Sequence, residues 1–145
     1  MTGMTMRTAV CACGRVEVTV ENEPLTVVIC HCDFCQKRTG SVFQVCAYFS
    51  TDQNIEVSGE TKLYNGLEID GIGSALGDGI SYHFCTTCGS TVYWTITGQP
   101  VLAIAVGDFV DPDFSAPTME FYVTRRHRWV PPVPAADRFE TFPTR

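Results

Sequence analysis

Apolar and polar residues alternate in short runs along most of the chain. In residues 15–21, the valines at positions 16, 18 and 20 share one face and polar side chains share the other, which is typical of a half-buried strand. The same pattern predicts strands over residues 25–29, 42–49, 54–57, 62–64, 80–84, 91–96, 101–106 and 119–124. Turn-forming pairs such as Asn65-Gly66 and Gly107-Asp108 separate several of these runs.

No long window has the period of an amphipathic helix, and only residues 33–39 and 111–115 could form a helical turn or two. We therefore predict an all-β domain with antiparallel sheets, because tight turns replace crossover connections. Residues 66–79 contain five of the twelve glycines, which predicts a mobile surface loop or a lid over a substrate cleft. After Val130, Pro131, Pro132 and Pro134 predict an extended tail that wraps the domain.

The composition narrows the class of protein. A chain of 145 residues, 45% of them hydrophobic, fits one globular domain over residues 1–145 with a core of its own. The formal net charge of −6 argues against a nucleic-acid partner, which requires a basic surface. We expect no membrane partner and a cytoplasmic location, because no apolar run approaches the roughly 20 residues of a membrane span and the start lacks a signal-peptide pattern.

In a reducing compartment, the eight cysteines are expected to be metal ligands or catalytic groups before they are disulfides. Two of their clusters have the form of chelating turns: Cys11-Ala12-Cys13-Gly14 and Cys85-Thr86-Thr87-Cys88-Gly89. Zinc prefers four tetrahedral ligands, and a glycine after the second cysteine allows the backbone to turn tightly. These four cysteines therefore predict a closed structural zinc site.

The third cluster, Cys30-His31-Cys32-Asp33-Phe34-Cys35, supplies three thiolates and leaves a fourth metal position open. An open position is typical of a catalytic zinc. The spacing also allows a site closed by Cys46, a mixed site completed by His31 or His83, or a redox disulfide. Cys46 itself lies in an alternating run, where a cysteine is commonly a buried packing residue.

The order of these clusters, together with Lys37-Arg38-Thr39-Gly40-Ser41 and His83-Phe84 before the last pair, resembles the glutathione-dependent formaldehyde-activating enzyme family. The resemblance runs from about Thr8 to Val130. It implies a two-zinc β-tent domain and a carbon–sulfur lyase activity that condenses formaldehyde with glutathione. By resemblance, Cys11, Cys13, Cys85 and Cys88 match the structural zinc ligands, and Cys30, Cys32 and Cys35 match the catalytic zinc ligands.

From these residues we hypothesise that a glutathione-like thiol binds at the three-cysteine zinc, ionises there and adds to an aldehyde. Lys37, Arg38 and Arg128 are the expected partners for its carboxylates, since basic residues are few and clustered in this acidic chain. His31, His83 and Asp33 are candidate proton carriers.

Two other functions remain open at the level of sequence: a non-catalytic zinc-binding module, and a sensor of aldehydes or redox state that acts through the same thiols. A purely structural module needs only the four-cysteine site, so the three-cysteine cluster favours the enzyme.

Overall fold

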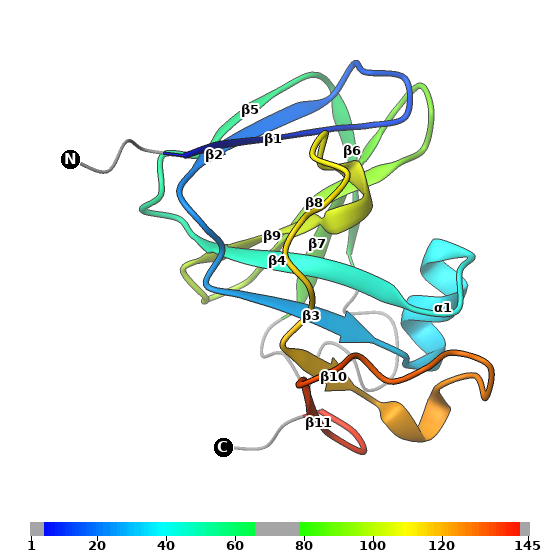
Figure 1. Ribbon diagram of the computed structural model, residues 1–145. Coiled ribbons are helices and arrows are strands. Elements are labelled where there is room, and N and C mark those ends of the chain that lie inside the picture. Colours follow the sequence, from blue (N-terminus) through cyan, green and yellow to red (C-terminus); the bar gives the residue numbers. More distant parts are fainter. Residues whose placement is uncertain (1–4, 66–78, 143–145) are drawn as a thin grey trace.

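A computed structural model of the chain describes residues 5–65 and 79–142, which form two sheets (Figure 1). The small sheet has the strand order β1 (Met6–Val10), β2 (Glu17–Glu21) and β5 (Glu56–Ser58). The large sheet has the order β11 (Asp137–Arg138), β10 (Met119–Phe121), β3 (Thr26–Cys30), β4 (Gln44–Ser50), β9 (Val101–Ala105), β8 (Thr91–Ile96), β7 (Ile80–Cys85) and β6 (Thr61–Asn65). Helix α1 (Asp33–Thr39) follows β3, and the 3-10 turns η2 (Val106–Asp108) and η3 (Val123–Arg125) follow β9 and β10.

The predicted all-β class is confirmed as a mostly-β fold, and α1 occupies residues 33–39, where the sequence allowed a helical turn or two. Residues 111–115 contain a turn and no helix. The expected segment 119–124 is a strand only as far as Phe121, after which Tyr122 adopts a left-handed conformation with φ of 57° and η3 begins. The expected loop at 66–79 lies outside the described residues apart from Gly79.

Most strand pairs are antiparallel, as predicted, and the exceptions involve β10. β10 pairs in parallel with both β3 and β11. A parallel pair needs a long connection between its strands, and both pairs have one: residues 31–118 separate β3 from β10, and residues 122–136 separate β10 from β11. The segment after Val130 then returns along β10 to form β11.

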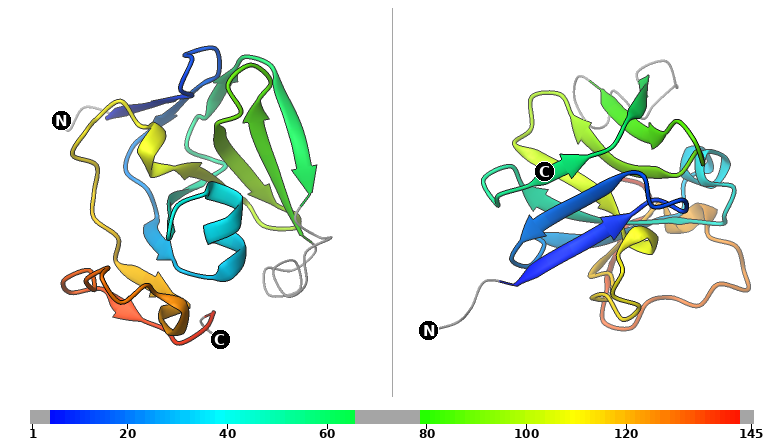
Figure 2. Two further views of the ribbon diagram at one scale, coloured as in Figure 1. Left: turned by 90° about the vertical axis from the view of Figure 1, so that its right-hand side faces the viewer. Right: turned by 90° about the horizontal axis from the view of Figure 1, so that it is seen from above.

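Alternation along the strands gives the large sheet two apolar faces. One face packs against the small sheet, around Val18, Phe49 and Ile104, all of which are fully buried. The opposite face carries Cys46, Tyr82 and Trp94. Figure 2 shows α1 standing beside this second face, between β3 and the strands β6 and β7. The junction of β3 and α1 therefore lies beside the face of the large sheet that carries Tyr82 and Trp94.

Among the described residues, no helix is long and apolar enough to cross a membrane.

Candidate metal centres and substrate cleft

The four cysteines of the two chelating turns come together in space although they are far apart in sequence. The sulfurs of Cys11, Cys13, Cys85 and Cys88 all lie within 4.8 Å of one another, with Sγ–Sγ distances of 3.6 Å for both the Cys11–Cys13 and the Cys13–Cys85 pairs. Tetrahedral zinc with bonds of about 2.3 Å separates its sulfurs by roughly 3.8 Å. The donor set and its spacing therefore fit a zinc ion of the closed type.

Backbone amides already point at these sulfurs. The Val16 amide donates to Cys11 Sγ at 3.2 Å, and the Thr87 amide donates to Cys85 Sγ at 3.4 Å. The turns depend on glycine, since Gly14 and Gly89 have φ of 81° and 79°, a region that side chains disfavour. A hydrogen bond with Ser90 lowers the pKa of Cys88 to about 5, which prepares it as a thiolate ligand.

The second cluster is built where β3 runs into α1. Cys30 ends the strand, Cys32 is the N-cap of the helix, and Cys35 lies in its first turn. The three sulfurs lie within 4.8 Å of one another, and the Cys35 amide donates to Cys32 Sγ at 3.3 Å. The helical turn is thus the local reason that a C-x-C-x-x-C spacing converges on one point.

These three sulfurs share negative charge unequally. Hydrogen bonds from Cys30 and Cys35 lower the pKa of Cys32 to about 3. Its hydrogen bond with Cys32 raises the pKa of Cys30 to about 12, and the two neighbouring sulfurs raise the pKa of Cys35 far above its usual value. The cluster is thus one thiolate that accepts hydrogen bonds from two thiols. A metal cation can displace the two thiol protons, so the cluster fits a metal ion with a fourth coordination position free.

None of the expected fourth ligands belongs to this cluster in the part of the chain that the structure describes. His31 points away from it, with Nε2 3.0 Å from Glu120 Oε1. His83 stacks on Tyr93 at a centroid distance of 4.3 Å and bonds to the Thr61 hydroxyl. Cys46 is buried on the neighbouring strand β4, where it pairs with Val28 and not with Cys30. Burial raises the pKa of its thiol to about 12.

An open cleft of about 630 Å³ lies between α1 and the strands β6, β7 and β8. Its lining is Asp33, Phe34, Lys37, Arg38, Tyr64, Tyr82, Phe84, Gly89 and Thr91. The Arg38 guanidinium lies over the rings of Tyr82 and Trp94, at 4.4 and 5.2 Å from their centroids, and such stacking fixes its position. Lys37 and Arg38 therefore both line this cleft, and their binding of a substrate carboxylate stays a prediction.

Arg128 is exposed and is not among the residues that line this cleft. Asp33 is also exposed and pairs with Arg125, with 2.8 Å between Oδ1 and Nε. The Arg125 guanidinium lowers the pKa of this carboxylate, so Asp33 is poorly suited to carry a proton near neutral pH.

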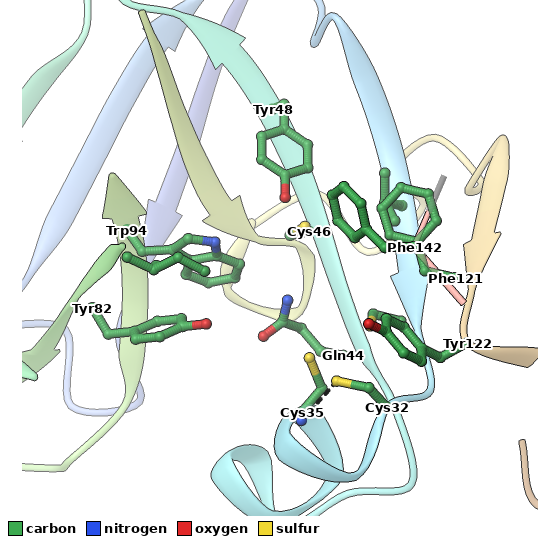
Figure 3. A pocket seen from close by; sticks show the side chains of 13 residues that line it. Cys32, Cys35, Gln44, Cys46, Tyr48, Tyr82, Trp94, Phe121, Tyr122 and Phe142 are labelled. Atoms are coloured by element: carbon green, nitrogen blue, oxygen red, sulfur yellow. Dashed lines mark hydrogen bonds between the residues drawn. The ribbon is translucent and has the colours of Figure 1, made fainter. Parts of the chain in front are cut away.

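A small apolar chamber opens beside the three cysteines, on the sheet face that carries Trp94 (Figure 3). Its volume is about 40 Å³. Its lining is Val28, Cys30, Cys32, Cys35, Gln44, Cys46, Tyr48, Ile80, Tyr82, Trp94, Phe121, Tyr122 and Phe142. The sequence pattern does not predict this chamber, and its one visible signal is that Gln44, Cys46 and Tyr48 share one face of their run.

The fold and the two clusters define a mostly-β, cysteine-rich protein with two sets of residues that could hold metal ions. The family model of the glutathione-dependent formaldehyde-activating enzymes matches residues 6–125. The chain therefore belongs to this family, which connects it with formaldehyde activation and glutathione.

Among solved structures, the chain is similar to the crystal structure of a Rhodobacter sphaeroides protein, with 23% sequence identity and a TM-score of 0.53. The similar region covers 73% of this chain and 90% of that one, and at this identity it shows a shared fold alone. The comparison with curated proteins gave no match.

Proposed function

We propose that the protein is a zinc-dependent carbon–sulfur lyase that condenses a formaldehyde-like aldehyde with a glutathione-like thiol to give an S-hydroxymethyl adduct. The observation that carries this proposal is the position of the Cys30, Cys32 and Cys35 sulfurs. They lie within 4.8 Å of one another and line an apolar chamber, and their helix also lines the cationic cleft. Membership of the formaldehyde-activating family supports the same reaction.

In this proposal, Cys11, Cys13, Cys85 and Cys88 hold a structural zinc, while Cys30, Cys32 and Cys35 hold a catalytic zinc. The catalytic ion, when bound, would supply the Lewis acidity that favours the ionised form of an incoming thiol at neutral pH. The protein's own contribution is orientation, since a thiol and an aldehyde held side by side react without the entropic cost of meeting in solution.

Lys37 and Arg38 orient the thiol by attracting its carboxylates. The stacking of Arg38 on Tyr82 and Trp94 fixes this cation at the boundary of the cleft. A side chain that is already fixed loses less conformational entropy when a ligand binds than a flexible one does. We assign this role to Lys37 and Arg38, and not to Arg128, because only the first two line the cleft.

A Cys32→Ser variant tests the site, with Cys46→Ser as the matched control in the same chamber. We expect the first variant to bind one metal equivalent fewer and to lose nearly all catalysed adduct formation, measured by exchange NMR between 13C-formaldehyde and its glutathione adduct. The control should keep its full metal content, because Cys46 is not one of the three clustered cysteines. A Cys32→Ser protein with full metal content and full activity would contradict the proposal.

The cleft is tested with Arg38→Gln, with Arg128→Gln as its control. The KM for glutathione should rise about tenfold or more in the first variant, the scale of one lost charge-assisted contact. The KM for 2-mercaptoethanol, which has no carboxylate, should change little in either variant. Equal effects on both thiols would show that the cleft does not bind the carboxylates.

A further inference from the structure

The chamber beside the three cysteines has a size that selects among carbonyl compounds. A dry cavity of about 150 Å³ holds benzene, which has six heavy atoms. The chamber measures about 40 Å³, and the same scale gives room for about two heavy atoms. A one-carbon aldehyde has two heavy atoms, a carbon and an oxygen, and any substituent on the carbon would meet the chamber wall.

The walls that set this limit are aromatic and come from different elements. Trp94 on β8 closes one side, and Phe121 on β10 with Phe142 of the C-terminal segment closes the other (Figure 3). Trp94 and Phe121 are 2% and 7% exposed, so their rings have little freedom to move aside. Because protein interiors are closely packed, even one additional heavy atom on the substrate would collide with these rings.

Few polar groups face this apolar space. Figure 3 shows the Gln44 side chain in the middle of the chamber, between the sulfurs and the aromatic walls. Gln44 Oε1 is buried and has no hydrogen-bond partner among the described residues. A buried acceptor without a donor is uncommon in native structures and calls for an explanation. A hydroxyl group entering the chamber would supply the missing donor.

The hydroxyl of Tyr82 points into the same space (Figure 3). Burial raises the pKa of Tyr82 and also that of Tyr48, well above the usual value of a phenol. Both side chains are therefore neutral at physiological pH and can donate a proton in a hydrogen bond. The Tyr48 hydroxyl already interacts with the Cys46 thiol. Tyr82 also lines the open cleft, so we take Tyr82 as the hydrogen-bond donor to the substrate.

We propose that this chamber is the subsite of the aldehyde, in which Tyr82 donates a hydrogen bond to the carbonyl oxygen, Gln44 accepts one from the hydroxyl of the adduct, and Trp94, Phe121 and Phe142 restrict the substrate to one carbon. This inference rests on the proposed function and adds specificity-determining residues to it.

The reaction in the chamber balances without a further reagent. The sulfur of the ionised thiol gives an electron pair to the aldehyde carbon and a carbon–sulfur bond forms. The π pair of the carbonyl moves onto the oxygen, which takes a proton from the Tyr82 hydroxyl. Tyr82 regains through water the proton that the thiol released, so thiol and aldehyde combine with nothing left over. The oxygen has then become a hydroxyl, the donor that Gln44 Oε1 lacks.

The experiment compares Tyr82→Phe and Gln44→Met with Tyr93→Phe, whose ring belongs to the core on the opposite face of the sheet. Exchange NMR with 13C-formaldehyde and glutathione gives the kinetics. We expect the first two variants to lose about tenfold or more in kcat/KM for formaldehyde, and Tyr93→Phe to match the unaltered protein. In a cobalt-substituted sample, the absorption change on adding glutathione reports thiol binding separately, and it should persist in all three variants.

Size selection is tested with Phe142→Ala, at a half-buried position near the end of the chain. This variant should raise kcat/KM for acetaldehyde relative to formaldehyde by about tenfold. Unchanged formaldehyde kinetics in Tyr82→Phe and Gln44→Met, with thiol binding intact, would overturn the chamber as the aldehyde subsite and leave the proposed function standing. Absence of any cobalt–thiol absorption change in the unaltered protein would overturn the proposed function and this inference with it.

Discussion

His31 and Glu120 form a buried pair in which neither side chain is exposed, with Nε2 of the histidine 3.0 Å from Oε1 of the glutamate. The other carboxylate oxygen accepts hydrogen bonds from the Val133 amide and from Arg138 Nε, both at 3.0 Å. Glu120 thereby connects His31, the residue between Cys30 and Cys32, to the C-terminal segment.

The variant Glu120→Gln should lose about 2 kcal/mol or more of the free energy of unfolding, because the charged partners of a buried carboxylate are left without compensation. Glu140→Gln, an exposed glutamate on the same segment, serves as control and should change little. Urea denaturation of the metal-loaded proteins measures both.

The same pair predicts a pH dependence. Burial opposes ionisation of Glu120, yet the hydrogen bonds from His31 and Val133 outweigh it and lower the pKa of the carboxyl. Its stabilising contribution is therefore complete above the usual carboxyl pKa and is lost as the pH falls through the lowered value in the folded protein. The Gln variant should lack this part of the acid destabilisation, and parallel pH profiles for the two proteins would contradict the role of Glu120.

Replacing Cys85 by Ser should remove the metal of the four-cysteine site and destabilise the fold strongly, by more than about 3 kcal/mol. The reason is that this site joins β1 and β2 of the small sheet to β7 of the large one. Metal analysis and thermal denaturation, with Cys46→Ser as the matched buried cysteine, give the measurement. Cys85→Ser with full metal content would show that the four sulfurs do not act as one site.

Gly59 is expected to tolerate no side chain. Its φ is 97°, and a Cβ there would overlap the Arg15 carbonyl oxygen of the neighbouring turn. Gly59→Ala should therefore cost about 2 kcal/mol or more in the free energy of unfolding. Gly107→Ala, with open space at its Cβ, should stay within about 0.5 kcal/mol of the unaltered protein. Equal unfolding midpoints for the two variants would contradict the geometry.

Asp108 gives a pH dependence of the opposite sign. Burial, with a smaller effect of Cys88, raises its pKa to about 6, and Oδ2 has no hydrogen-bond partner among the described residues. Above this pH, the folded protein holds the Asp108 carboxylate in its charged form at a partly buried position, which costs free energy of folding. Asp108→Asn should then be more stable by about 1 kcal/mol near pH 7.5, a value reduced for partial exposure.

The advantage of Asp108→Asn should shrink as the pH falls, to about half near pH 5, because the folded carboxyl is then mostly protonated. The exposed Asp113→Asn is the control, and urea denaturation at several pH values is the measurement. An advantage that grows on acidification would show that the pKa is not raised.

The sequence predicted the strands well because alternation reports directly which side chains face a core. It failed at β1, where Ala9 is the one fully buried residue in Met6–Val10, so no alternation marks the strand. It also failed at the two-residue strand β11, which is too short for any period. Parallel pairing of β10 with β3 depends on contacts across about ninety residues, and local patterns carry no information about such pairing.

The metal-capable clusters were predictable because chelating turns are local and have a characteristic spacing. The surroundings of the three-cysteine cluster were not. Tyr82, Trp94 and Phe121 each look like ordinary core residues of a strand, and only the fold shows that they border one cavity with Gln44. Glu120 likewise resembles a surface residue of a strand in sequence, and its burial follows from the tail that covers it.

The two clusters differ in how far apart their ligands lie along the chain, and this difference sets an order of assembly during synthesis. Cys30, Cys32 and Cys35 leave the ribosome almost together, whereas Cys13 must wait for Cys85, 72 residues later. Closing a long loop costs more chain entropy and slows folding. A nascent chain therefore presents the complete short cluster to a metal before the long one exists, and the long cluster can close while β9, β10 and β11 are still to be added to the large sheet.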